Sequence, residues 1–185
     1  MCEIYPEIGV KRLVLVFVAL GLLSGNVAGA EEETQEPIPR DPATGLFRYL
    51  GVVTVEGVAP DDLYARAKGW VATGYKSLNK NSLKRDDAVM RLTVKGTMRL
   101  QWETFSTVYV DHVVTIEVRN GGYRYTVGGL VVEFASKYSK PPTPLERSDA
   151  LEPGREKMLQ KIGAEIDAMI DSLRLAMHEP SIDEW

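Results

Sequence analysis

The chain has 185 residues, of which 44% are hydrophobic and 26% charged, and its formal net charge is −4. Such a chain is long enough for one globular domain with its own hydrophobic core. The acidic balance argues against nucleic acid as a partner, because phosphate binding needs a concentrated basic surface.

Residues 1–30 have the three parts of a secretory signal peptide. The basic pair Lys11-Arg12 precedes an apolar run from Leu13 to Leu23, and small residues follow up to Ala30. The apolar run is roughly half of the ~20 residues that a helix needs to span a bilayer. We therefore expect cleavage after Ala30 and an exported protein, periplasmic or secreted, with no stable membrane span.

Cysteine chemistry is not expected in the mature chain. Cys2 is the single cysteine and lies ahead of the apolar run, so cleavage removes it. The mature protein would then have no disulfide, no thiol nucleophile and no cysteine-based metal site, although its compartment permits disulfides. We expect no metal and no cofactor.

Composition divides the rest of the chain into a leader, one domain and a tail. The leader, residues 31–45, begins EEETQEPIPRDP, which is acidic and interrupted by proline. Such a segment has little to bury, so we expect it to be disordered. Apolar periodicity continues over residues 46–178, which predicts a single domain, and residues 179–185 form a frayed tail.

The domain begins with a predicted strand and a predicted helix. Apolar and polar residues alternate from Leu46 to Glu56, which indicates a half-buried strand. Pro60, Asp61 and Asp62 then favour a helix start, because proline suits the first turn and carboxylates are favoured near the positive end of the helix dipole. Apolar residues at helical spacing extend this helix to about Lys76 and place Trp70 in the core.

The longest alternation in the chain runs from Ala88 to Glu103, AVMRLTVKGTMRLQWE. Its even positions are mostly apolar and its odd positions polar, which predicts a strand with one face on the core and one toward water. Gly96 within it indicates a bulge, a bend or a close approach to the backbone. A short strand from Ser82 to Arg85 and a turn at Asp86-Asp87 are expected before it.

Two further strands, Thr107 to Arg119 and Tyr123 to Phe134, are expected to form an antiparallel hairpin. The connecting residues Asn120-Gly121-Gly122 accept positive φ angles and are a strong hairpin signal. Gly128-Gly129 interrupts the alternation of the last strand and predicts a bulge. His112 falls on the apolar side of its strand, which favours a buried, hydrogen-bonded histidine over a general base.

The C-terminal part is predicted to be a loop followed by a helix. The segment from Ser136 to Pro153 contains four prolines and little apolar periodicity, which indicates a long surface loop and a possible functional one. From Arg155 to Met177 apolar residues recur at helical spacing. Asp149 and Glu152 have the spacing of a capping box for that helix. The pattern thus predicts an α+β fold in which two helices cover one face of an antiparallel sheet of about five strands.

Four short motifs in order resemble a known family: DDLYARAKGW from Asp61 to Trp70, Tyr75-Lys76-Ser77, Val94-Lys95-Gly96, and IEVRNGGYRY from Ile116 to Tyr125. They are similar to exported bacterial domains of unknown function whose fold is described as like that of the TATA-box-binding protein. The resemblance covers roughly residues 46–178. It implies a curved antiparallel sheet with both helices on one side, and it implies no catalytic residue. A shared fold does not imply DNA binding.

The polar face of the sheet is the candidate binding site. With Tyr109, Tyr123 and Tyr125 nearby in sequence, an open concave sheet could hold an anionic or peptidic partner. The alternative is a solvated face whose opposite charges stabilise strand pairing by a few tenths of a kcal/mol per pair. The residues expected on this face are Arg91, Lys95 and Arg99 at spacing four on the long strand, and Asp111, Thr115, Glu117, Arg124 and Thr126 on its neighbours.

Three functional hypotheses follow. The chain has no GxSxG elbow, no HExxH pair and no phosphate-cradling glycine loop, and His178 has the position of a helix C-terminal cation. We therefore favour a non-enzymatic binding or envelope-interaction module whose partner is a protein, a peptide or an envelope component. The alternatives are a carboxylate-dependent hydrolase with its site near the long loop, and a structural subunit that oligomerises through the sheet edges.

Overall fold

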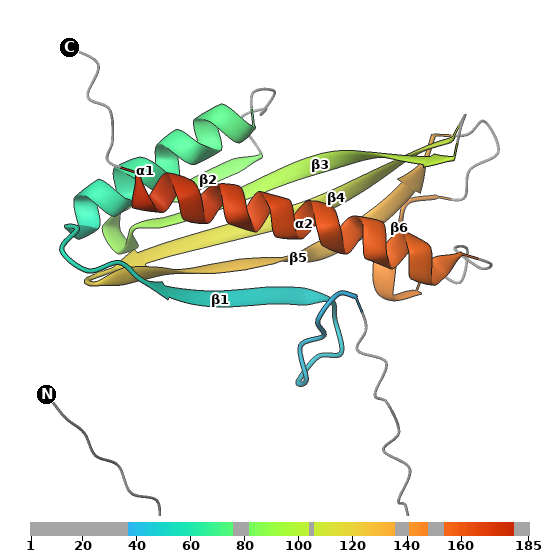
Figure 1. The fold of residues 1–185 in the computed structure, drawn as a ribbon, viewed down its shortest axis with the longest axis horizontal. Coiled ribbons are helices and arrows are strands. Elements are labelled where there is room, and N and C mark those ends of the chain that lie inside the picture. Colours follow the sequence, from blue (N-terminus) through green and yellow to red (C-terminus); the bar gives the residue numbers. More distant parts are fainter. Residues whose placement is uncertain (1–36, 76–81, 104–105, 136–140, 148–153, 180–185) are drawn as a thin grey trace, which may run out of the picture. The chain divides into compact units, whose positions relative to one another are not determined.

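The computed structural model describes residues 37–75, 82–103, 106–135, 141–147 and 154–179 (Figure 1). These residues belong to one compact unit, Gln35–Trp185. The expected signal peptide, the proposed capping box at Asp149 and Glu152 and most of the expected tail lie outside the described residues. The elements are β1 (Arg48–Thr54), α1 (Pro60–Gly74), β2 (Leu83–Asp86), a 3-10 helix (Asp87–Val89), β3 (Arg91–Glu103), β4 (Ser106–Arg119), β5 (Gly122–Phe134), β6 (Thr143–Pro144), a 3-10 helix (Leu145–Arg147) and α2 (Arg155–His178).

The strands form one curved, entirely antiparallel sheet with the order β1-β5-β4-β3-β2, and β6 pairs with β5. Both helices cover the same face of this sheet (Figure 1). This architecture confirms the predicted α+β class. The sheet has six strands where about five are predicted, because the two-residue strand β6 lies in a segment with no alternation to reveal it.

The face of the sheet under the helices, which we call the inner face, forms the core. Alternate residues of β3, β4 and β5 point into it and meet the apolar stripes of α1 and α2, as the two periodicities predict. Trp70 of α1 is in this core, and its Nε1 donates a hydrogen bond to Ser172 Oγ of α2 at 3.0 Å. The fully buried side chains include Leu63, Leu92, Ile116, Leu130, Met158, Ile162, Ile166, Leu173 and Met177.

Two segments contribute to the core where composition predicts a disordered leader and a surface loop. Ile38 is fully buried, and Arg40 forms an antiparallel bridge with Phe47. Leu145 is fully buried as well, and the neighbouring Glu146 accepts a hydrogen bond from the Phe47 backbone N–H at 2.9 Å. Residues 37–45 therefore differ from the predicted leader, and residues 141–147 differ from a plain surface loop. A single buried aliphatic residue carries no periodicity, so the sequence pattern misses it.

The long strand begins later than the alternation predicts. The alternation starts at Ala88, but residues 87–89 form a 3-10 turn and Met90 has a left-handed φ of 49°. The Tyr64 hydroxyl donates a hydrogen bond to Asp87 Oδ1 at 2.7 Å, which fastens this turn to α1. β3 therefore starts at Arg91.

Gly96 is a site of close approach and not a bulge. Pairing between β3 and β4 is regular across Gly96 and His112, and the register shift in this pair lies between Gln101 and Glu103. A Cβ at Gly96 would lie 2.4 Å from Tyr75 Cε1. The bulge predicted at Gly128-Gly129 is confirmed, because the register of β4 against β5 shifts opposite it and Gly129 has a φ of 63°.

Candidate functional site

The side of the sheet opposite the helices, which we call the outer face, carries the candidate site. Strand register assigns its residues, because partners in a ladder point to the same side. None of the residues on this face is buried. They are Arg48, Leu50, Val52 and Thr54 of β1; Arg124, Thr126, Gly128, Val131 and Glu133 of β5; Tyr109, Asp111, Val113, Thr115, Glu117 and Arg119 of β4; Arg91, Thr93, Lys95, Thr97 and Arg99 of β3; and Lys84 and Asp86 of β2.

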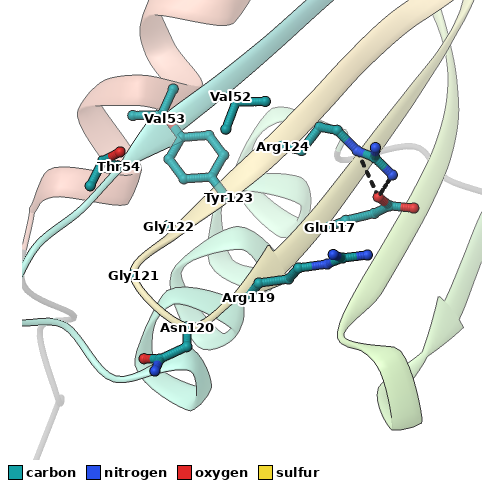
Figure 2. A pocket seen from close by; sticks show the side chains of 10 residues that line it. All are labelled: Val52, Val53, Thr54, Glu117, Arg119, Asn120, Gly121, Gly122, Tyr123 and Arg124. Atoms are coloured by element: carbon teal, nitrogen blue, oxygen red, sulfur yellow. Dashed lines mark hydrogen bonds and ion pairs between the residues drawn. The ribbon is translucent and has the colours of Figure 1, made fainter.

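Three of the predicted site residues form one row across the sheet. Arg91 pairs with Glu117 in the β3–β4 ladder, and Glu117 pairs with Arg124 in the β4–β5 ladder. Glu117 Oε1 lies 2.6 Å from Arg91 Nε, and Glu117 Oε2 accepts a hydrogen bond from Arg124 Nε at 2.8 Å and contacts the Arg124 NH2 group as well (Figure 2). One carboxylate thus binds two guanidinium groups.

The two arginines keep Glu117 ionised. The hydrogen bond from Arg124 lowers the pKa of the Glu117 carboxyl below its usual value, and the charges of Arg124 and Arg91 act in the same direction. Both arginines remain about half exposed, so this row is a surface network. It follows the stabilising pattern of opposite charges across strands, and two cations against one anion leave an excess of positive charge.

The remaining predicted residues are spread along the face. Thr97 Oγ1 donates a hydrogen bond to Asp111 Oδ1 at 2.6 Å, and the hydroxyls of Thr93 and Thr115 lie 3.4 Å apart. Lys95 and Arg99 are exposed. The cations at spacing four lie about 13 Å apart along the strand, so Arg91, Lys95 and Arg99 do not converge on one point.

Arg119 belongs to the outer face and is absent from the predicted set. It is exposed at the end of β4, and its side chain points to the same side as Glu117 and Arg124 (Figure 2). It makes no hydrogen bond or ion pair with any residue in the described part of the chain. The sequence could have indicated it, because every second residue of a strand points to the same side and Arg119 lies two residues after Glu117 on the same strand.

Cations outnumber carboxylates among the described side chains of the outer face, although the chain as a whole has a net charge of −4. The excess positive charge of this face is therefore local, and it faces solvent. The cations are Arg48, Lys84, Arg91, Lys95, Arg99, Arg119 and Arg124, and the carboxylates are Asp86, Asp111, Glu117 and Glu133.

Three adjoining hollows indent this face along β1 and β5, and a fourth lies over β3 and β4 around Lys95 and Asp111. One of about 350 Å³ lies beside the β4–β5 turn and includes Val52, Arg119 and Arg124 (Figure 2). The next, of about 300 Å³, includes Leu50 and Arg124. The third, of about 280 Å³, includes Leu46. A binding partner would therefore find concave surface along β1 and β5.

Two of the tyrosines expected near the site are elsewhere. Tyr123 and Tyr125 are buried on the inner face, and the Tyr125 hydroxyl accepts a hydrogen bond from Arg174 of α2 at 3.1 Å. They alternate with Arg124 along β5, so they point to the opposite side of the sheet, toward the core. Tyr109 lies on the outer face as expected, opposite Arg99.

The prediction of a buried, hydrogen-bonded His112 is confirmed, since its exposed fraction is 3%. Its Nε2 lies 3.1 Å from the Tyr75 hydroxyl, and its Nδ1 lies 3.4 Å from the Val110 carbonyl oxygen. The neutral tautomer with the proton on Nδ1 satisfies both contacts. Burial lowers the pKa of His112 below its ordinary value, which keeps the ring neutral.

Among the described residues, no group of three or more His, Cys, Asp or Glu side chains is arranged to hold a metal ion. No helix in the described ranges is long and apolar enough to cross a membrane.

Comparison with protein families identifies the fold. Residues 49–133 match the model of a family described as a domain of unknown function (DUF4468) with TBP-like fold. The match confirms the resemblance that the motifs indicate, and the description of the family assigns no activity. No curated protein matches the chain significantly.

Solved structures show the same fold. A TBP-like protein from Parabacteroides distasonis matches with a TM-score of 0.69 and 12% identity, over 79% of this chain and 100% of that chain. A DUF4468 family protein from Bacteroides ovatus matches with a TM-score of 0.60 and 13% identity, over 80% of this chain and 94% of that chain. At this level of identity the similarity shows the fold alone.

Proposed function

We propose that this DUF4468 domain is an exported binding module that holds an anionic partner on the outer face of its sheet. The observation that carries the proposal is the excess of cations, in an acidic protein, on a face that no described element covers. Lys95, Arg99 and Arg119 are its strongest contributors, because each is exposed and none is neutralised by a hydrogen bond or ion pair to a described residue. The signal-like segment at residues 1–30 supports export.

Binding to such a face should be electrostatic and dependent on salt. Exposed charges act through water, where the screening length is ~8 Å at physiological ionic strength. Complementary charge of this kind chiefly accelerates association and selects the sign of the partner. We therefore expect the affinity for an anionic partner to fall steadily as salt is added.

The test is binding of a fluorescein-labelled oligoglutamate, measured by fluorescence anisotropy. The triple variant Lys95→Glu, Arg99→Glu, Arg119→Glu should lose about tenfold or more in affinity, because three attractive charges become repulsive. All three side chains are exposed, so thermal unfolding should remain close to that of the wild type.

The matched control is a triple charge reversal on the helices, Lys68→Glu, Arg155→Glu, Lys157→Glu. It changes the net charge by the same amount, but its residues lie on α1 and α2, which cover the opposite face (Figure 1). Its affinity for oligoglutamate should fall only slightly. If both triple variants lost the same affinity for oligoglutamate, the loss would depend on net charge alone, and a site on the outer face would be refuted.

A further inference from the structure

The three hollows along β1 and β5 form one continuous groove. The hollow beside the β4–β5 turn and the middle hollow share Glu117 and Arg124. The middle hollow and the third share Arg48, Thr115 and Thr126. The groove therefore follows the whole of β1, whose seven residues span about 23 Å at the rise of a strand.

Exposed aliphatic side chains line the groove on the β1 side. Leu46, Leu50 and Val52 are 52%, 63% and 77% exposed, and each belongs to a different one of the three hollows. Leu50 and Val52 lie two residues apart on the same face of β1, which places them about 7 Å apart. This is also the distance between every second side chain of an extended peptide.

Cations line the groove on the side away from β1, whereas Arg48 of β1, which lines two of the hollows, is ion-paired with Asp41. Arg124 on β5 and Arg119 on β4 both belong to the hollow beside the turn, and their guanidinium groups point the same way (Figure 2). The carboxylate between them, Glu117, is already bound by two arginines. An acidic side chain of a partner would therefore be attracted to the side of the groove that carries Arg124 and Arg119.

We propose that this groove binds an extended peptide in which apolar and acidic side chains alternate. Successive side chains of an extended chain point to opposite sides, so a peptide lying along the groove would direct one set toward Leu50 and Val52 and the other toward Arg124 and Arg119. This inference rests on the proposed function, since it names the partner of the outer face and the place where the partner lies.

The test uses synthetic peptides and fluorescence anisotropy on the folded domain. The labelled probe alternates valine and aspartate. One comparison peptide replaces aspartate with lysine, and another has the same composition with all valines before all aspartates. The alternating acidic probe should bind, and the lysine version should show no binding. The block version should bind about tenfold more weakly, because its valine half can contact only the aliphatic side of the groove and its aspartate half only the arginine side.

Two substitutions locate the binding. Val52→Asp should weaken binding of the alternating probe about tenfold, since it replaces apolar contact with charge repulsion. Leu175→Asp is the matched control, because Leu175 is an exposed leucine, 61% accessible, on α2. Both positions are exposed, so both variants should unfold near the wild-type temperature, and only Val52→Asp should lose affinity.

The outcomes separate this inference from the proposed function. Equal binding of the alternating and block peptides, or an unchanged affinity in Val52→Asp, would overturn the groove while leaving the response of oligoglutamate to the triple reversal intact. A labelled oligothymidylate that binds as tightly as the alternating probe would also overturn it, since nucleic acid lacks the alternating apolar side chains. Failure of every anionic probe to bind the wild type would refute both proposals.

Discussion

The two faces of the sheet are built from the same strands and follow different physical rules. On β4, Val114, Ile116 and Val118 are buried under the helices, while Thr115 and Glu117, which alternate with them, lie on the outer face. The inner face depends on close packing, in which even one added carbon matters. The outer face depends on screened charges and an open groove, where single changes have small effects on stability. Stability and binding should therefore respond to different substitutions on the same strands.

The largest difference between the two faces is expected when one leucine on each face is truncated. Leu92 of β3 is buried on the inner face and Leu50 of β1 is exposed on the outer face. Leu92→Ala should lower the free energy of unfolding by about 2–5 kcal/mol through lost burial and a residual cavity, and Leu50→Ala by no more than about 0.5 kcal/mol. Urea denaturation measures both. Similar losses would mean that the outer face is also part of a packed interface.

Adding a methyl group tests the packing of the inner face in the other direction. A Cβ at Gly96 would lie 2.4 Å from Tyr75 Cε1 and 2.9 Å from His112 Nε2, so Gly96→Ala should destabilise the domain by about 1–3 kcal/mol. Gly69 in α1 has open space around its Cβ position. Gly69→Ala should stabilise by about 0.5–1 kcal/mol through helix propensity. Thermal unfolding of the pair gives the sign of each change, and a stabilising Gly96→Ala would contradict the close approach.

The buried histidine makes the stability of the inner face dependent on pH. Burial lowers the pKa of His112 in the folded state. As pH falls below the pKa of about 6.5 that histidine has in the unfolded chain, the unfolded chain binds a proton that the folded chain does not bind. Stability should therefore be complete above that value and fall as pH decreases toward the folded pKa, by up to about 1.4 kcal/mol per pH unit.

The measurement is urea denaturation between pH 7 and pH 5, compared with His112→Gln. The variant should lose most of the slope in this range, whereas the control His178→Gln, at the exposed end of α2, should keep it. The carboxyl groups of Glu117 and Asp41 have lowered pKa values because of arginine partners, so their contributions are lost at more acidic pH. A slope that persists in His112→Gln would assign it to another group.

The sequence predicts most of the fold because the period of two and the helical period are properties of neighbouring residues. The alternation around Arg91 and Glu117 is enough to assign both to the outer face. Their contact depends on the register between β3 and β4, which no local pattern contains. Nor does any local pattern bring Tyr75 to His112 through the gap left by Gly96, since these residues are far apart in sequence.

The sequence pattern also fails to predict the burial of single apolar residues that belong to no periodic run. Ile38 and Leu145 reach the core from segments rich in proline, in which no apolar periodicity indicates burial. The groove is missed for a related reason. Leu50 and Val52 look like ordinary strand residues, and their exposure follows from the absence of a described element over the outer face. Tyr123 and Tyr125, in contrast, could have been assigned to the core, because their parity is opposite to that of Arg124.

At Glu117, stability and binding affinity should change in opposite directions, and both changes should be small. Glu117→Gln removes the charge that binds Arg91 and Arg124, and a surface network of this kind contributes no more than about 1 kcal/mol. It also removes the one carboxylate among the described residues that line the groove, so affinity for the alternating acidic probe should rise about threefold. Glu165→Gln on the exposed side of α2 should change neither. If the affinity fell, the carboxylate would be needed to hold Arg124 in its binding position, and the groove would depend on the ion pair for its shape as well as its charge.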